Sequence, residues 1–208
     1  VLSVFTYRTE EEAVKLAENS EAAIIFAGLP NRFETEGMDR EHLELPENQN
    51  ALISRVAGVQ PNTVVVLHNG SPVTMPWKEE VNSILEMYLG GDGVSEAEMD
   101  LLYGKHNPGG KLAETFPVKL EDNPSFLNFP GENGVTEYRE GIFVGYRYYE
   151  KKKQTVLFPF GHGLSYTSFS YKNLRIEEEG EMDNKKITVS LNVKNTGNYA
   201  GKEVVQVY

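Results

Sequence analysis

The sequence of 208 residues contains no cysteine, which excludes disulfide bonds and thiolate metal sites. Basic residues are few: 20 lysines and arginines stand against 31 aspartates and glutamates, so the net charge is −11. Such a surface repels phosphate groups, and we expect neither nucleic acid nor an anionic membrane as a partner. No apolar run approaches the roughly 20 residues that a membrane-spanning helix needs.

Several common site motifs are also missing. The four histidines are widely scattered and form no H-x-x-x-H pair, so we expect no metal site and no cofactor. The glycine-rich stretch 90–93 lacks the Gly-Lys-Ser/Thr ending of a P-loop. Two interpretations of it remain: an anion-binding site at a helix N-terminus, or a tight turn between a strand and a helix. Ser71 and Ser95 lack the surrounding G-x-S-x-G pattern, which disfavours a serine hydrolase.

The first 115 residues alternate between two kinds of hydrophobic pattern. Short continuous apolar runs bounded by turn residues predict buried parallel strands near 22–27, 63–67 and 84–89. Apolar residues at helical spacing predict helices near 10–19, where Thr9 and Glu12 form a capping box, and near 47–58, with a short helix at 77–81. Strands that alternate with helices indicate a layered α/β domain.

The pattern changes twice further along the chain. Residues 117–165 are rich in proline, glycine and aromatic residues and have little periodicity, which predicts a long meandering segment. From about residue 168 the apolar residues alternate with polar ones, as in 187–193, which predicts antiparallel strands with one buried face and a further strand over 204–208. Because the chain begins with valine and ends within a strand-like run, we expect a piece of a longer polypeptide.

The acidic stretch 34–40 follows the first predicted strand. Ligand-facing residues collect at the carboxyl ends of parallel strands, so this loop is a candidate site. Glu34 and Glu36 are two residues apart and point the same way in an extended loop, while Asp39 and Arg40 can pair. A charged, solvated loop is the alternative. For Trp77 and the tyrosines at 146, 148 and 149, stacking on sugar rings and packing in the core are both open.

Five motifs, in this order, resemble glycoside hydrolase family 3. They are Glu34–Arg40 with Leu45-Pro46 and Gln49, Val64–Val73, Asn107–Leu112 with Thr115-Phe116-Pro117, Glu140–Tyr149, and Phe158–Tyr166. Asn195-Thr196-Gly197 with Gly201–Val204 is similar to a fibronectin-III-like domain. The resemblance implies a three-layer α/β/α sandwich with a mostly parallel sheet over residues 1–166, and the start of an incomplete antiparallel β-sandwich over 167–208.

The resemblance also implies a function in the β-glucosidase branch of that family. Such enzymes are retaining glycosidases that cleave terminal β-D-glucosyl residues, here from a β-glucoside or a short β-glucan oligosaccharide. A TIM-like barrel, which would be this chain's partner domain, supplies the aspartate nucleophile, and the α/β sandwich supplies the general acid/base. On the family's motif the acid/base is Glu36, Glu34 is secondary, and Asp39 with Arg40 braces the loop.

Two other functions are compatible with the sequence. One is a non-catalytic carbohydrate-binding or scaffold module with the same fold, since the barrel and its nucleophile lie outside these residues. The other is a flavodoxin-like nucleotide binder, since a layered α/β fold hosts many functions. If the parent reading frame encodes a barrel with an aspartate nucleophile, an enzyme is favoured over a non-catalytic module. Flavin absorbance of the purified protein would indicate the nucleotide binder.

Overall fold

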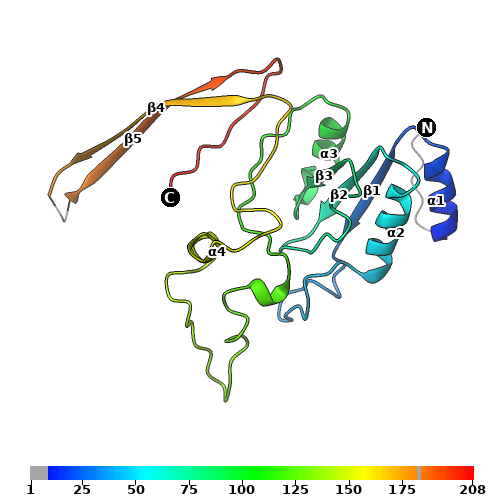
Figure 1. The fold of residues 1–208 in the computed structure, drawn as a ribbon, viewed down its shortest axis with the longest axis horizontal. Helices are drawn as coiled ribbons and strands as arrows, with labels where there is room; N and C mark the ends of the chain where they lie inside the picture. Colours follow the sequence, from blue (N-terminus) through cyan, green and yellow to red (C-terminus); the bar gives the residue numbers. More distant parts are fainter. Residues whose placement is uncertain (1–8, 182–183) are drawn as a thin grey trace. The chain divides into compact units, whose positions relative to one another are not determined.

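The computed structural model describes residues 9–181 and 184–208 (Figure 1). The chain divides into two compact units. The first unit extends to Ser95 and also contains Glu114–Phe160, and the second contains Glu96–Ala113 and Gly161–Tyr208. The domain boundary between residues 166 and 167 that the sequence predicts differs from this division into units, and it stays a prediction.

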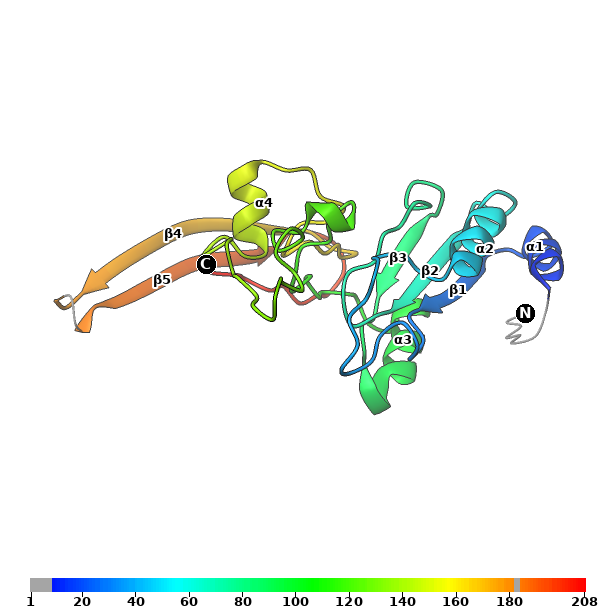
Figure 2. The ribbon, with the colours of Figure 1, turned by 90° about the horizontal axis from the view of Figure 1, so that it is seen from below.

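A parallel three-stranded sheet forms the centre of the first unit. Its strands β1 (Ala23–Gly28), β2 (Thr63–His68) and β3 (Ser83–Glu86) lie side by side in the order β1-β2-β3 (Figures 1 and 2). The central strand β2 is the most deeply buried, with Val65, Val66 and Leu67 fully inaccessible to solvent. The continuous apolar run of β2 fits a central strand that is covered on both faces, whereas Phe26 of β1 is 52% exposed.

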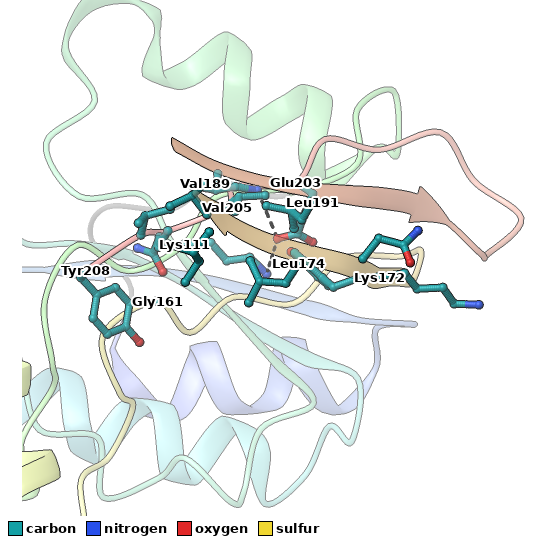
Figure 3. Close-up of a pocket in the computed structure, with 15 residues that line it drawn as sticks. Lys111, Gly161, Lys172, Leu174, Val189, Leu191, Glu203, Val205 and Tyr208 are labelled. Atoms are coloured by element: carbon teal, nitrogen blue, oxygen red, sulfur yellow. Dashed lines mark hydrogen bonds and ion pairs between the residues drawn. The ribbon is translucent and has the colours of Figure 1, made fainter. Parts of the chain in front are cut away.

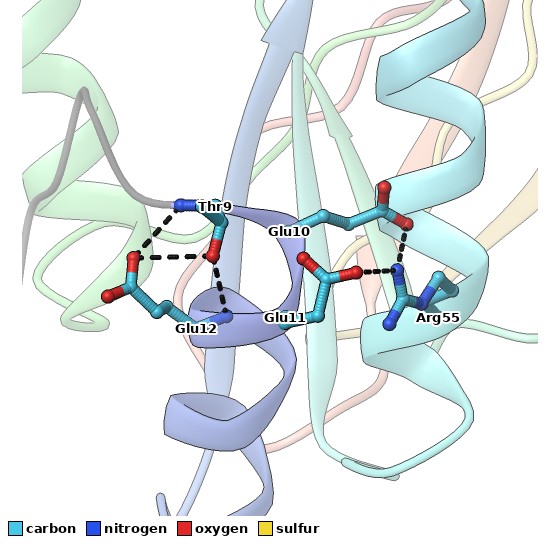
Figure 4. A network of polar contacts seen from close by, with 5 residues as sticks. All are labelled: Thr9, Glu10, Glu11, Glu12 and Arg55. Carbon is cyan, nitrogen blue, oxygen red and sulfur yellow. Dashed lines mark hydrogen bonds and ion pairs between the residues drawn. The ribbon is translucent and has the colours of Figure 1, made fainter.

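The helix α1 (Glu10–Glu18) begins as its sequence predicts. The backbone N–H of Glu12 donates to Thr9 Oγ1, and Thr9 N–H donates to Glu12 Oε2 at 3.0 Å, which completes the capping box (Figure 4). Arg55 on α2 (Glu47–Ala57) reaches across to Glu10 at 2.7 Å and Glu11 at 3.4 Å. These ion pairs are exposed to solvent and add little to stability, and α2 packs against both α1 and the sheet.

The helix α2 supplies the buried stripe that covers β1 and β2. Ile53 is fully buried and Val56 nearly so. Trp77 is also fully buried, and its indole N–H donates to Asn50 Oδ1 at 2.9 Å. This burial decides in favour of core packing for Trp77 over sugar stacking. The short helix predicted at 77–81 is wrong: the chain there makes isolated turns, such as Lys78 N–H to Met75 C=O, with no continuing helical ladder.

The segment 114–160 returns to the first unit as a long, mostly irregular run, as its composition predicts. Phe116 and Phe158 form an isolated antiparallel bridge, and Phe116 is almost fully buried. A short helix, η2 (Leu120–Asp122), and α4 (Tyr146–Lys152) are the regular elements in this run. The rings of Tyr146 and Phe160 stack with centroids 4.8 Å apart, and Tyr149 is buried, so packing accounts for both tyrosines.

The second unit holds most of α3 (Val94–Leu102), which follows the short turn η1 (Gly91–Gly93), and a long antiparallel hairpin. The hairpin pairs β4 (Phe169–Glu179) with β5 (Lys186–Asn195), and a β-bulge lies between Lys172 and Arg175 (Figure 2). The strand predicted at 204–208 is wrong, since these residues carry no strand pairing. A parallel sheet with helices, followed by an antiparallel sheet, confirms the predicted fold class.

Candidate active site

The carboxyl ends of β1, β2 and β3 meet at one edge of the parallel sheet, and three connecting segments start there. Residues 29–46 follow β1, residues 69–82 follow β2, and residues 87–90 follow β3. The candidate site lies among these segments, as expected for an open α/β sheet.

The exit from β1 is fixed by a side chain of α2. Gln49 Oε1 accepts from Gly28 N–H at 2.8 Å, and Gln49 Nε2 donates to Gly28 C=O at 2.9 Å. Gly28 also lies against the neighbouring strand, where a Cβ on it would come within 2.1 Å of the His68 carbonyl oxygen. The backbone at the start of segment 29–46 is therefore fixed by the close contact of Gly28 with His68 and by both polar groups of the Gln49 amide.

The acidic loop, residues 34–40, carries Glu36 at its tip. Thr35 and Met38 form an isolated antiparallel bridge, and Glu36 and Gly37 make the turn between them. Gly37 adopts a φ of 82°, a left-handed conformation that favours glycine. The side chain of Glu36 is exposed to solvent.

Glu34 and Arg40 attach both ends of this loop to the turn that follows β2. Glu34 Oε2 accepts from Gly70 N–H at 2.7 Å, and Oε1 accepts from the Ser71 hydroxyl at 2.8 Å. Arg40 Nη1 donates to Ser71 Oγ at 2.9 Å and to the Pro72 carbonyl at 3.0 Å. Asp39 is exposed, so the predicted Asp39–Arg40 pairing stays a prediction beside these observed partners of Arg40.

Burial affects the charge of Arg40. Desolvation lowers the pKa of this guanidinium, and the negative charge of Glu34 opposes that shift. Arg40 Nη2 is buried and has no hydrogen-bond partner. The negative charge of Glu34 therefore partly compensates the buried positive charge of Arg40. The two side chains are linked by Ser71 Oγ, which is hydrogen-bonded to both.

A second carboxylate, Glu86, closes β3 and was not singled out by the sequence. Its pKa is raised to about 7, mainly by burial and also by the charges of Glu114 and Glu34, while hydrogen bonds from Tyr88 N–H and Asn69 oppose the shift. Burial also raises the pKa of Glu114, with Glu34 adding to it. Three carboxylates thus act on one another at this edge, and burial raises the pKa of both Glu86 and Glu114. A carboxylate inside the apolar run 84–89 was the signal that could have found it.

We expect the protonation of Glu86 to make stability depend on pH. Its pKa rises on folding from the ordinary 4.5 to about 7, so the folded state binds more protons between these values. This contribution is present below pH 4.5 and is lost as the pH rises toward 7, by at most about 3 kcal/mol. Glu86→Gln should therefore stabilise the protein progressively between pH 5 and 8, measured by urea unfolding at several pH values.

The exposed Glu80 offers a matched control, since Glu80→Gln removes the same charge without a buried environment. The Glu80→Gln variant shows how much of the difference comes from removing a surface carboxylate alone. A stability difference between Glu86→Gln and wild type that stays constant from pH 5 to 8 would contradict the assignment of a raised pKa to Glu86.

The other candidate features from the sequence give no evidence of a binding site. The ring of His68 stacks on Phe26 with centroids 6.5 Å apart, which supports a structural role. Within residues 9–181 and 184–208, no group of three or more His, Asp or Glu side chains is arranged to hold a metal ion. In the same described residues, no helix has the length and apolar character to cross a membrane.

The second unit contains an open groove of about 720 Å³ beside the hairpin (Figure 3). Apolar side chains of β4, β5 and the 203–208 segment line much of it, including Leu174, Val189, Leu191 and Val205. Lys111 donates to the Gly163 carbonyl at 2.6 Å and lies 3.5 Å from a carboxylate oxygen of Glu203. Lys111 is thus already paired, and none of the predicted site residues lines this groove.

Comparison with known proteins decides the family. The profile of the glycosyl hydrolase family 3 C-terminal domain matches residues 6–166, most of the chain. The chain belongs to glycoside hydrolase family 3. Among curated family 3 relatives, it is 59% identical to thermostable beta-glucosidase B of Acetivibrio thermocellus over 95% of the chain and 26% of the relative. It is 48% identical to the probable beta-glucosidase I of Aspergillus oryzae over 94% of the chain and 24% of that protein.

Solved structures of the family agree with this fold. The beta-glucosidase of Kluyveromyces marxianus superimposes with a TM-score of 0.85 at 44% identity, over 92% of this chain and 23% of that one. The family 3 beta-glucosidase of Bifidobacterium adolescentis gives 0.85 at 43% identity, over 90% of this chain and 28% of that one. The chain therefore spans about a quarter of the length of the relatives that it matches.

Proposed function

We propose that this chain is the acid/base-bearing part of a retaining β-glucosidase that hydrolyses terminal, non-reducing β-D-glucosyl residues. The carrying observation is the position of Glu36, exposed at the tip of a loop that is anchored at the carboxyl edge of a family 3 α/β sheet. The names of the relatives, which are β-glucosidases, support the substrate class. β-Glucosides or short β-glucan oligosaccharides are the substrates we expect.

Glu36 would act twice in this reaction. In the first step its protonated carboxyl gives a proton to the glycosidic oxygen as the bond to C1 breaks, while an aspartate on the TIM-like barrel attacks C1. In the second step the Glu36 carboxylate removes a proton from water, and the resulting hydroxide displaces the aspartate from C1. The proton taken up from water restores the acid for the next cycle.

The isolated chain should not turn over a β-glucoside. Retaining chemistry needs two carboxyl groups about 5–5.5 Å apart, one acid/base and one nucleophile. A general acid contributes only about 10²–10⁴-fold, and without a nucleophile that factor has no covalent step to accelerate. We expect no hydrolysis of an aryl β-glucoside by the purified 208-residue chain under conditions in which the full-length protein is active.

This comparison also tests the proposed function itself. The Glu36→Ala version of the isolated chain serves as the control for contaminating glycosidases, since it is purified in the same way. Clear turnover by the isolated chain, above the rate of a Glu36→Ala version of the same chain, would show that a second carboxylate within these residues is the nucleophile. An inactive full-length protein would favour a non-catalytic module.

A further inference from the structure

We propose that Glu34 is a positioning residue that holds Glu36 in place by clamping the acidic loop to the turn after β2. The clamp consists of Glu34, Gly70, Ser71 and Arg40, all in the first unit. This inference rests on the proposed function, because Glu36 is the group that the clamp would position. Glu34 itself touches no reacting atom in this proposal.

The clamp joins the two ends of the loop at one hydroxyl. Ser71 Oγ donates its proton to Glu34 Oε1 at 2.8 Å and accepts from Arg40 Nη1 at 2.9 Å. A serine hydroxyl has one donor and two acceptor positions, so this arrangement uses the donor and one acceptor. The second Glu34 oxygen accepts the backbone N–H of Gly70 at 2.7 Å. Charge-assisted bonds of this kind are shorter and stronger than neutral ones.

The turn is shaped to receive the carboxylate. A Cβ on Gly70 would lie 3.0 Å from Glu34 Oε1 and 3.1 Å from its carboxyl carbon, with Leu89 Cδ1 also at 3.0 Å. These distances are tighter than an ordinary side-chain contact, so a glycine lets Glu34 approach the backbone N–H. Asn69, which is fully buried, donates to the Ser71 carbonyl at 3.0 Å and stabilises the same turn from within.

The position of Glu36 follows from this clamp by short connections. Glu36 is two residues from Glu34, and the bridge between Thr35 and Met38 ties the intervening turn into a tight hairpin. With Glu34 fixed at one end and Arg40 at the other, the tip has few other conformations. A misplacement of about 1 Å at a reacting group can cost about 100-fold in rate, so a loop without its clamp should lose activity with little loss of substrate affinity.

The test compares variants of the full-length protein in two backgrounds. In otherwise wild-type enzyme, we expect Glu34→Ala and Ser71→Ala to lower kcat on a glucoside with a poor leaving group about 10- to 100-fold, with KM changed less than about threefold. Ser71→Thr retains a hydroxyl and should recover most of the rate. Glu41→Ala, an exposed carboxylate just beyond the loop, is the matched control and should behave as wild type.

The second background is Glu36→Ala, assayed with an activated aryl glucoside and saturating azide. If Glu34 acts through Glu36, adding Glu34→Ala or Ser71→Ala should change that azide-supported rate less than about twofold, since the group being positioned is gone. An equal fall in both backgrounds would overturn the proposal and assign Glu34 to substrate contact or general stability. An unchanged kcat for both variants in the wild-type background would overturn it as well.

Folding and the proposed function are controlled separately. The melting temperature of each variant shows whether it folds. If Glu34→Ala does not fold, the test rests on Ser71→Ala, which removes only a single hydroxyl. The Glu36→Ala variant alone tests whether Glu36 is the acid/base. If that variant retains full turnover without azide, the proposed function fails, whereas the clamp fails only when the two backgrounds respond alike.

Discussion

Replacing Glu36 by alanine in the full-length protein should slow substrates with poor leaving groups far more than activated ones. The departing oxygen of an alkyl glucoside needs a proton, and loss of a general acid removes about 10²–10⁴-fold in rate. Aryl glucosides with acidic phenols leave without that proton and should keep their first step. Steady-state kinetics on a series of glucosides with leaving groups of different pKa would measure this dependence.

The second step should then become limiting for activated substrates. Without a base to deprotonate water, the covalent glucosyl-enzyme should accumulate, giving a burst of released phenol followed by slow turnover. Azide needs no deprotonation, so it should attack the intermediate, restore turnover and yield β-glucosyl azide. Glu34→Ala retains Glu36, so azide should raise its rate far less than that of Glu36→Ala. Rescue of Glu34→Ala, with none for Glu36→Ala, would reverse the assignment of the two carboxylates.

Gly28→Ala should be among the most destabilising single substitutions in the first unit. The added Cβ would lie 2.1 Å from the His68 carbonyl oxygen and 2.9 Å from its carbon, so β1 and β2 would have to separate at their carboxyl ends. Overpacking against backbone has no flexible side chain to relieve it, and we expect a loss of about 3 kcal/mol. The free energy of unfolding from denaturant titration would measure it.

Gly93→Ala is a matched control for that substitution. A Cβ at Gly93 has no neighbour within 4 Å, and its φ lies outside the left-handed region. The same chemical change should therefore alter stability by no more than about 1 kcal/mol, and a small gain is expected because alanine restricts the unfolded chain. Equal losses from the two substitutions would show that the contact between Gly28 and His68 is not the cause.

Local patterns were sufficient to predict the elements that are marked by a continuous apolar run or by partners close together in the chain. The apolar runs over 22–27 and 63–67 became β1 and β2, and Thr9 with Glu12 formed its capping box. The 77–81 helix failed because Trp77 is buried in an alternating pattern with Val73 and Met75, which is not a helical spacing, and only isolated turns follow. The strand at 204–208 failed because a period of two describes a face but does not supply a hydrogen-bonding neighbour.

The candidate site was predictable only in part for the same reason. Glu36 could be nominated from the sequence because its motif is continuous, and its role as the acid/base stays a prediction. The clamp joins Glu34 to Gly70 and Ser71, which are 36 and 37 residues away, and no local pattern shows that contact. Glu86 was missed because its raised pKa comes from burial and from carboxylates on other segments, which only the folded sheet brings together.

The N–H of Gly70 offers a direct view of how long the acidic loop stays closed. Its amide hydrogen lies at the chain surface, yet it is bonded to the carboxylate of Glu34 and not to backbone. Its exchange with deuterium therefore requires that the hydrogen bond to Glu34 break. Exchange of the amides within β2 requires larger openings that break hydrogen bonds of the sheet. The ratio of the two exchange rates, followed by NMR, would report the fraction of time that the loop spends released, in solution and before any substrate binds.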